Sequence, residues 1–117
     1  MTVRRVVPDI LTKDKAESRD FYKLIGLEQV MNRGWVMTLA SPSNPTAQVI
    51  LITHEATAPV VPDLSIEVDD VDAVHAAMVE RGAEIVYSLR DEGWGVRRFF
   101  VRDPNGQVVN VVSHQNR

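Results

Sequence analysis

DKAESRDFYKLIGLEQV, at residues 14–30, decides the fold, because DVDAVHAAMVERGAEIV at residues 70–86 repeats its pattern. The two stretches align without a gap, and their identical residues are 56 positions apart. A repeat of this length indicates two copies of one supersecondary unit. The identical pairs are Asp14 and Asp70, Gly26 and Gly82, Glu28 and Glu84, and Val30 and Val86.

Each copy predicts one helix with defined ends. Asp14 is a good N-cap, and Glu17 three residues later completes a capping-box pattern. Gly26 suits the left-handed position after the last helical turn. Asp70 and Gly82 serve the second helix in the same way. Apolar residues at helical spacing should pack on the sheet: Phe21, Leu24 and Ile25 in the first helix, and Val71, Val74 and Met78 in the second.

Strand patterns surround both helices. One precedes each helix and three follow it, so the predicted order is β-α-β-β-β, twice. Residues 103–106 (DPNG) suit a type I turn between the last two strands. We therefore expect an α+β fold in a single domain of residues 1–117: module one at about 1–54, a linker at 55–61 and module two at about 62–117.

Composition narrows the function. The formal net charge of −3 and the lack of a basic patch disfavour nucleic acid as a partner. The absence of cysteine excludes disulfides and thiolate metal ligands, and it fits a cytoplasmic protein. No apolar run approaches the roughly 20 residues of a membrane span, and no signal peptide is recognisable. We expect no membrane partner.

The last strand, QVVNVVSH at residues 107–114, carries a lone amide, Asn110, among valines. A buried amide must find hydrogen-bond partners, which are either protein groups or a ligand. In the strand before the second helix, alternation puts the apolar residues on one face and Asp63, Ser65 and Glu67 on the other. The apolar face should pack on the helix.

The repeat, together with WGVRRFFVRDPNG at residues 94–106, resembles the vicinal oxygen chelate superfamily of glyoxalases, extradiol dioxygenases, and fosfomycin- and bleomycin-resistance proteins. The resemblance covers almost the whole chain. It implies two βαβββ modules whose mixed sheet curls around a cavity, with the helices on the outer face. It also implies a homodimer, and it leaves open whether the first strand is swapped between subunits.

Enzymes of that superfamily bind a divalent metal at four strand positions, which the resemblance carries over to Val7, Leu51, Asp63 and Asn110. Valine and leucine cannot be ligands, and a carboxylate with an amide is a poor site for Zn²⁺, Fe²⁺ or Mn²⁺. We therefore expect no metal and no other cofactor. A shifted metal site built from His54, Asp63 and His114 stays open.

Other residues are candidates for binding a ligand. Trp94 lies between two glycines and either stacks on a flat ligand or anchors its loop. Arg97 alternates with Phe99 and is expected to point inward, whereas Arg98 shares a face with Arg102 and is expected to be solvated. The predicted ligand-binding residues are Asp9, Asp63, Glu67, Trp94, Arg97, Phe99 and Asn110.

The prediction is a metal-free protein that sequesters or carries a small aromatic or acidic molecule, as a resistance protein does. The alternative is a lyase, isomerase or dioxygenase that uses an atypical metal site, or a carboxylate base at Asp63 or Glu67. A third hypothesis is a structural or regulatory dimer with a vestigial pocket.

Overall fold

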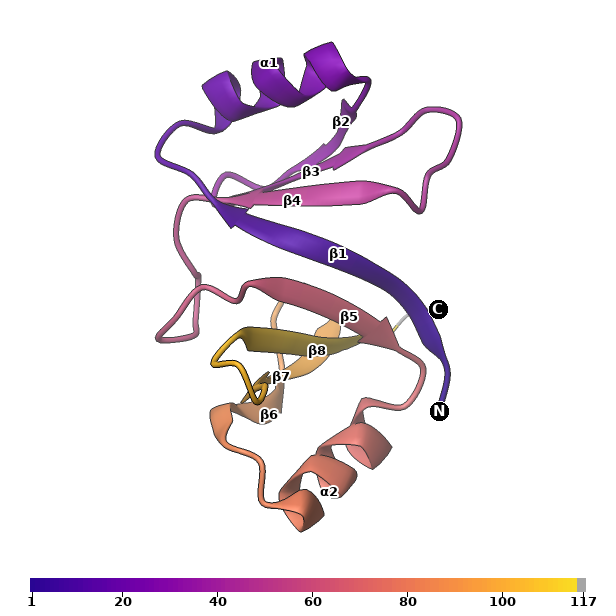
Figure 1. Ribbon diagram of the computed structural model, residues 1–117, viewed down its shortest axis with the longest axis vertical. Coiled ribbons are helices and arrows are strands. Elements are labelled where there is room, and N and C mark those ends of the chain that lie inside the picture. The colour runs from indigo at the N-terminus through magenta and orange to yellow at the C-terminus, as the bar shows by residue number, and fades with distance from the viewer. Residues whose placement is uncertain (116–117) are drawn as a thin grey trace. The chain divides into compact units, whose positions relative to one another are not determined.

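The computed structural model describes residues 1–115, and these form two helices and eight strands in the predicted order β-α-β-β-β, twice (Figure 1). The α+β class and the two modules are thus confirmed. The elements are β1 (Val3–Leu11), α1 (Lys15–Ile25), β2 (Glu28–Asn32), β3 (Val36–Ala40), β4 (Gln48–Ile52), β5 (Leu64–Val68), α2 (Val71–Arg81), β6 (Ile85–Asp91), β7 (Val96–Arg102) and β8 (Val108–His114).

Both helices begin and end where the sequence predicts. The Asp14 carboxylate accepts a hydrogen bond from the Glu17 backbone N–H at 3.1 Å, and Asp70 accepts one from Ala73 at 3.0 Å. Gly26 and Gly82 end the helices with φ of 120° and 81°, a region that strongly favours glycine. Within residues 1–115, neither helix is long and apolar enough to cross a membrane.

The chain divides into two compact units. The N-terminal unit is Val7–Val61, and the C-terminal unit combines Met1–Val6 with the chain from Pro62 onward. The module boundaries expected from the sequence stay a prediction, and β1 is shared between the two units. Its opening residues are held in the C-terminal unit, where the Thr2 backbone N–H donates to the Asp69 carboxylate at 2.8 Å.

The sheet of the N-terminal unit has the order β2-β3-β4-β1, with β1 and β4 parallel and the other pairs antiparallel. One face packs against α1 (Figure 1). The core there is Met37, Leu39 and Leu51, which Tyr22 and Leu27 contact from the helix side.

The apolar stripe predicted for α1 is wrong. Phe21, Leu24 and Ile25 are exposed, Leu24 by 90%, and α1 has no buried residue. Tyr22 is the aromatic residue of α1 that packs on the core, with the ring of Phe21 edge-on beside it at a centroid distance of 5.2 Å. The three exposed residues follow helical spacing, but their shared face points away from the sheet.

The sheet of the C-terminal unit has the order β5-β8-β7-β6, with β5 and β8 parallel. Here the predicted stripe of α2 is confirmed, since Val71 is buried in the core and Val74 and Met78 pack against it. The sheet contributes Val68, Phe99, Val101, Val109 and Val111 to the same core, and Leu64 and Ile66 pack against it. The apolar face of β5 therefore meets the helix, as expected.

Candidate functional site

The face of the C-terminal sheet opposite α2 carries charged and polar side chains, and we call it the polar face. Strand pairing defines it. Ser65 of β5 lies opposite Asn110 of β8, which lies opposite Phe100 of β7. Two residues further along, Val112 lies opposite both Glu67 and Arg98. Because side chains alternate along a strand, these residues share one face.

Glu67 is a deeply buried charged residue of the polar face, with 1% of its surface exposed. Arg5 of β1 donates from Nε to its Oε1 at 2.9 Å, and His114 Nδ1 lies 3.4 Å from the same oxygen. A buried carboxylate needs such partners because its desolvation is costly. The three side chains together offer an acceptor, a fixed cation and a titratable imidazole.

A second buried ion pair joins Glu92 to Arg98, which is 4% exposed. Arg98 Nε and Nη2 both lie 2.8 Å from Glu92 Oε2, and the Tyr87 hydroxyl donates to the same oxygen at 3.0 Å. The Arg98 guanidinium also lies 5.0 Å from the ring centre of Trp94 and 4.9 Å from that of Phe100. Cation–π contacts of this kind fix a guanidinium in place.

The expectation that Arg98 is solvated is therefore wrong, and Trp94 packs on that arginine. This contact is the loop-anchoring arrangement that the sequence allowed for Trp94, while its stacking on a ligand stays a prediction. Sequence reasoning also passed over Arg5 and Glu92. One signal in the sequence could have placed Arg98 on the polar face. The turn at Asp103–Gly106 sets the pairing of β7 with β8, which puts Phe100 opposite Asn110 and Arg98 two residues further along the same face.

Asn110 is buried, and its amide group is only partly satisfied. Its Nδ2 donates to the Ser65 hydroxyl at 3.0 Å. Its Oδ1 is inaccessible to solvent and accepts no hydrogen bond from any residue in the range 1–115. A buried acceptor without a partner costs about 1–3 kcal/mol, so it is an unusual feature of a native protein.

Asp63 is exposed and takes part in strand pairing. Its Oδ2 accepts a hydrogen bond from the Val108 backbone N–H at 2.7 Å, and its own N–H donates to the Val108 carbonyl at 2.8 Å. The carboxylate thus extends the ladder between β5 and β8. Its other oxygen, Oδ1, is the atom that remains for a ligand.

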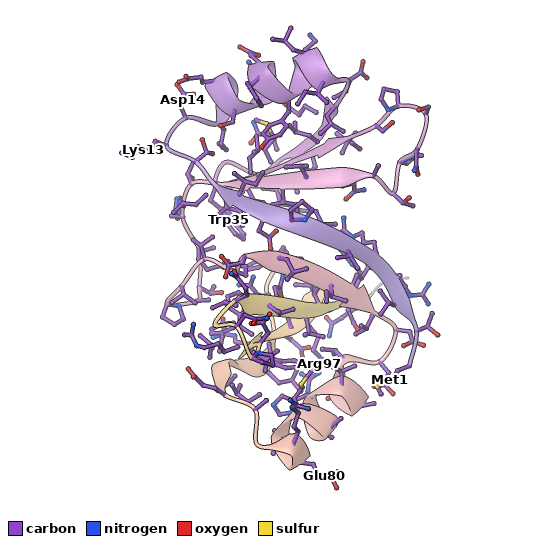
Figure 2. All side chains as sticks on the ribbon, in the orientation of Figure 1. Met1, Lys13, Asp14, Trp35, Glu80 and Arg97 are labelled. Carbon is purple, nitrogen blue, oxygen red and sulfur yellow. The ribbon has the colours of Figure 1, made fainter. Side chains whose placement is uncertain are left out.

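Arg97 and Phe99 do not join the polar face. They lie on the same face as each other, as expected, but that face is the one covered by α2. Phe99 is fully buried there, with the His75 ring edge-on at a centroid distance of 4.9 Å. Arg97 lies beside α2 (Figure 2), where its Nη2 pairs with Asp72 at 2.9 Å. Strand alternation excludes both from a site built on Asn110 and Glu67.

The Arg97 pair perturbs both of its partners. A hydrogen bond from Arg97 holds the pKa of Asp72 below its usual value, and the same contact raises the pKa of Arg97. Asp91 adds a second carboxylate, 3.3 Å from Arg97 Nη1. Arg97 therefore has two acidic partners on the α2 side, which a ligand would have to displace.

Asp9 lies on β1 in the N-terminal unit, where it is buried and opposite Ile50 of β4. Its position in the repeat is equivalent to Ser65, which pairs with Asn110 in the same parallel arrangement. The predicted part of Asp9 in ligand binding is not tested by this geometry and stays a prediction.

The same pairing corrects one of the four positions inferred from the family. Because Asp9 lies opposite Ile50, the counterpart of Asn110 is Ile50, and Leu51 points into the core beneath α1. Isoleucine is no more a metal ligand than leucine. Val7 is fully buried, so two of the four positions are aliphatic, and the donor set does not fit a divalent metal.

The shifted metal site also lacks support. His54 is exposed in the N-terminal unit, where its Nδ1 lies 3.1 Å from the Thr53 hydroxyl, while His114 lies against Glu67. Among residues 1–115, no cluster of three or more histidine, aspartate or glutamate side chains could hold a metal ion.

The chain belongs to a class of small proteins that are built from two βαβββ modules. Both helices are capped, and one module has a charged sheet face. The family model described as Glyoxalase/Bleomycin resistance protein/Dioxygenase superfamily matches residues 3–111. The chain belongs to this superfamily. No curated protein matches it in sequence.

Solved structures share the fold at low sequence identity. One from Legionella pneumophila, described as an NAD-dependent benzaldehyde dehydrogenase, has a TM-score of 0.76 at 18% identity over 93% of this chain and 98% of that chain. A superfamily member from Vibrio splendidus 12B01 has a TM-score of 0.70 at 20% identity, over 97% and 99%. Methylmalonyl-CoA epimerase from Mycobacterium tuberculosis has 0.62 at 19%, over 96% and 87%. These likenesses establish the fold alone.

Proposed function

We propose that the protein binds a small aromatic or acidic molecule at the polar face without a metal, and that it sequesters or carries this molecule. The observation that carries the proposal is the buried Asn110 Oδ1, which accepts no hydrogen bond within residues 1–115. A ligand N–H or O–H directed at this oxygen removes the cost of its burial. The half-buried Arg5 and the buried Arg98 support an acidic group on the same ligand, which would share each guanidinium with its partner Glu67 or Glu92.

A matched pair of ligands tests this proposal. In a thermal-shift and calorimetric screen, 4-hydroxybenzoate should stabilise the protein, while 4-methoxybenzoate, which lacks the donor, should bind about tenfold more weakly. Asn110→Leu should remove the difference between the two ligands. Asn105→Leu, in the exposed turn, is the control and should leave it unchanged. Equal binding of both ligands to the native protein would count against Asn110 as the acceptor.

The metal-free part of the proposal rests on the aliphatic residues Val7 and Ile50. Elemental analysis of protein purified without chelator should find less than about one-tenth equivalent of transition metal per chain. A stoichiometric ion would overturn this part and leave the ligand-binding part to be judged by the matched ligands.

A protein that sequesters an antibiotic can act as a resistance determinant, because it lowers the concentration of free drug in the cell. A susceptible bacterium that expresses the chain should tolerate more of an aromatic antibiotic that shifts the melting temperature in the same screen. The Asn110→Leu variant should give less protection at equal expression. Without protection by any such compound, the carrier interpretation is favoured over resistance.

An enzymatic alternative is favoured by one observation, the 3.4 Å approach of His114 Nδ1 to the buried Glu67 carboxylate. A carboxylate beside an imidazole can remove and return a proton next to a carbonyl group. Deuterium from solvent should then appear at that carbon of a bound acid, as measured by NMR. Glu67→Gln should abolish the exchange if Glu67 is the base, and Asp63→Asn should do so if Asp63 is.

We also propose a cytoplasmic homodimer. The exposed apolar residues Phe21, Leu24 and Ile25 on α1 support an interface, because apolar surface of this kind commonly marks contacts between subunits. Sedimentation should find a dimer that Leu24→Glu dissociates. The absence of cysteine from the sequence supports the cytoplasmic assignment, which fractionation of the native host would check.

A further inference from the structure

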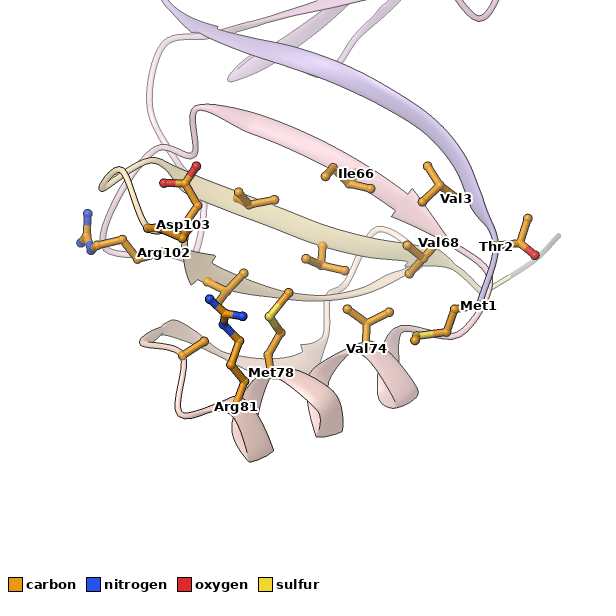
Figure 3. A pocket seen from close by; sticks show the side chains of 15 residues that line it. Met1, Thr2, Val3, Ile66, Val68, Val74, Met78, Arg81, Arg102 and Asp103 are labelled. Atoms are coloured by element: carbon orange, nitrogen blue, oxygen red, sulfur yellow. The ribbon is translucent and has the colours of Figure 1, made fainter.

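The C-terminal unit contains an apolar cavity on the α2 side of its sheet, away from the polar face. Its volume is about 480 Å³. The sheet contributes Ile66, Val109 and Val111, and α2 contributes Val74 and Met78, whose side chains extend toward the sheet (Figure 3). This volume lies within the range of roughly 300–1,000 Å³ that is typical of small-molecule sites.

The cavity exists because α2 covers only part of the apolar face beneath it. Val74 and Met78 pack against the core but stay partly exposed, and Val3 of β1 is 59% exposed where it lines the same space. Apolar surface left accessible to water in this way gains free energy when an apolar group covers it. The floor of the cavity offers only aliphatic side chains, so the buried part of a ligand should be a hydrocarbon.

The charges at the rim differ in their partners. Arg102 pairs with Glu84 at 3.3 Å and donates to the Gly106 carbonyl at 3.0 Å. The Asp103 carboxylate accepts from the backbone N–H groups of Asn105 and Gln107. Both charges are therefore engaged in the structure of the unit.

Arg81 is different. It lies in the last turn of α2, extends from the helix toward the sheet (Figure 3), and lines the cavity. No hydrogen bond or ion pair joins its side chain to another residue in the described part of the chain. A guanidinium recognises a carboxylate through two parallel hydrogen bonds, so this cation supplies the polar half of a site whose other half is apolar.

We propose that this cavity is a second binding site, which takes an unbranched aliphatic carboxylate of medium length. The hydrocarbon chain lies between α2 and the sheet, against Met78 and Val111, and the carboxylate pairs with Arg81. The site is independent of the polar face, because side chains on opposite faces of one sheet do not share a ligand. It therefore stands whether or not the proposed function does.

Calorimetry with decanoate tests the charge. Decanoate should bind, and decan-1-ol should bind about tenfold more weakly because it lacks the anion. Arg81→Gln should weaken decanoate about tenfold and leave decanol unchanged. Arg33→Gln, an exposed arginine of the N-terminal unit, is the matched control and should change neither affinity. Binding of decanoate that is insensitive to Arg81→Gln would overturn the proposal.

A second pair of variants tests the location. Val3→Trp adds bulk inside the cavity from an exposed position and should abolish decanoate binding. Val79→Trp adds the same bulk on an exposed part of α2 that does not line the cavity, and it should bind decanoate normally. Binding of 4-hydroxybenzoate should be unaffected by either variant. If decanoate does not bind and Val3→Trp instead dissociates a dimer, a second copy of the chain covers the cavity and the proposal fails.

Discussion

Leu11 and Glu67 occupy equivalent positions on the first strands of the two modules, 56 residues apart, yet Leu11 is 64% exposed and Glu67 is 1% exposed. Further positions along the two sheets also differ, with an aliphatic residue in the N-terminal unit where the C-terminal unit has a polar or charged one. Ile50 and Asn110 are equivalent through their pairing with Asp9 and Ser65. The next pairs outward place Val36 opposite Ile52 in one unit and Arg98 opposite Val112 in the other.

These differences show that the repeat preserves backbone features and varies side chains. Caps and turn glycines recur because they determine where a helix begins and ends. The residues on the sheet face opposite the helix are free to differ, since either aliphatic or paired charged side chains satisfy the same strands. Within the described residues, the buried ion pairs Arg5–Glu67 and Arg98–Glu92 both lie in the C-terminal unit.

The two helices differ in a corresponding way. Val71, Val74 and Met78 of α2 contact the core of their unit, whereas Phe21, Leu24 and Ile25 of α1 are exposed. Truncation of one phenylalanine to alanine in each unit should give the largest difference in the free energy of unfolding. Phe99→Ala should lower the free energy of unfolding by about 3–5 kcal/mol because it leaves a cavity in a packed core. Phe21→Ala, compared in the dissociated Leu24→Glu background so that the proposed dimer interface does not contribute, should change it by less than about 0.5 kcal/mol. Urea unfolding of both variants measures this, and equal losses would mean that α1 is packed after all.

Removal of a buried charge from the polar face should give the next largest change in the free energy of unfolding. Arg98→Met should cost about 3 kcal/mol because it leaves the buried Glu92 carboxylate with less compensation. Adding Glu92→Leu should recover most of that loss, since an apolar pair replaces the ion pair. If the double variant is no more stable than the single one in urea, the contacts of Arg98 with the aromatic rings dominate.

The two cap glycines should show no difference between the units. Gly26→Ala and Gly82→Ala should each cost about 1–2 kcal/mol, because alanine is strained at positive φ. An added Cβ meets no atom within 4 Å at either position, so backbone strain is the whole effect. A clearly unequal pair of melting curves would show that one helix end contributes to something besides its own termination.

The smallest effect concerns Asp72 and Arg97. Because Arg97 holds the pKa of Asp72 below its usual value, the pair stabilises the fold at neutral pH and loses this contribution as pH falls through the lowered pKa. Asp72→Asn should therefore be slightly less stable than the native chain at pH 7, and the gap should close in acid. The Asp72 side chain is 62% exposed and that of Arg97 is 31% exposed, so solvent screens the pair and the gap is small. Melting temperatures across the acid range would test it, and a gap that widens in acid would contradict the assignment.

Helix ends, strand order and the turn at Asp103–Gly106 were predictable because each depends on a few neighbouring residues. Asp14 with Glu17, and Gly26 with its positive φ, act within one helical turn. The family followed from the same local patterns. The burial of Asn110 was also predictable, since its amide lies among valines in one strand.

It was harder to predict which residues of a strand point toward the helix and which point toward the opposite face of the sheet. Phe99 and Phe100 are both fully buried, so the apolar pattern of β7 gives no sign of which face carries the ligand-binding residues. Arg102 lies on the same face as Arg98, and this pattern favours Arg97 as the inward-pointing arginine, although Arg98 is the buried one. The family positions carried over from the sequence name Leu51 where the strand pairing names Ile50, because a shift of one residue moves a side chain to the other face of the sheet. The exposure of Phe21 depends on tertiary packing, which helical periodicity does not encode.

The division of β1 between the two units has a consequence for synthesis on the ribosome. Residues 7–61 form one uninterrupted piece of chain, so that unit can complete itself as soon as it emerges. The other unit must wait for its last strand and then recruit residues 1–6, which are made before the whole N-terminal unit; Arg5 finds its partner Glu67 across 62 positions. Closing so long a loop is slow, and until then residues 1–6 lack their partners in the folded unit and are open to proteases and chaperones.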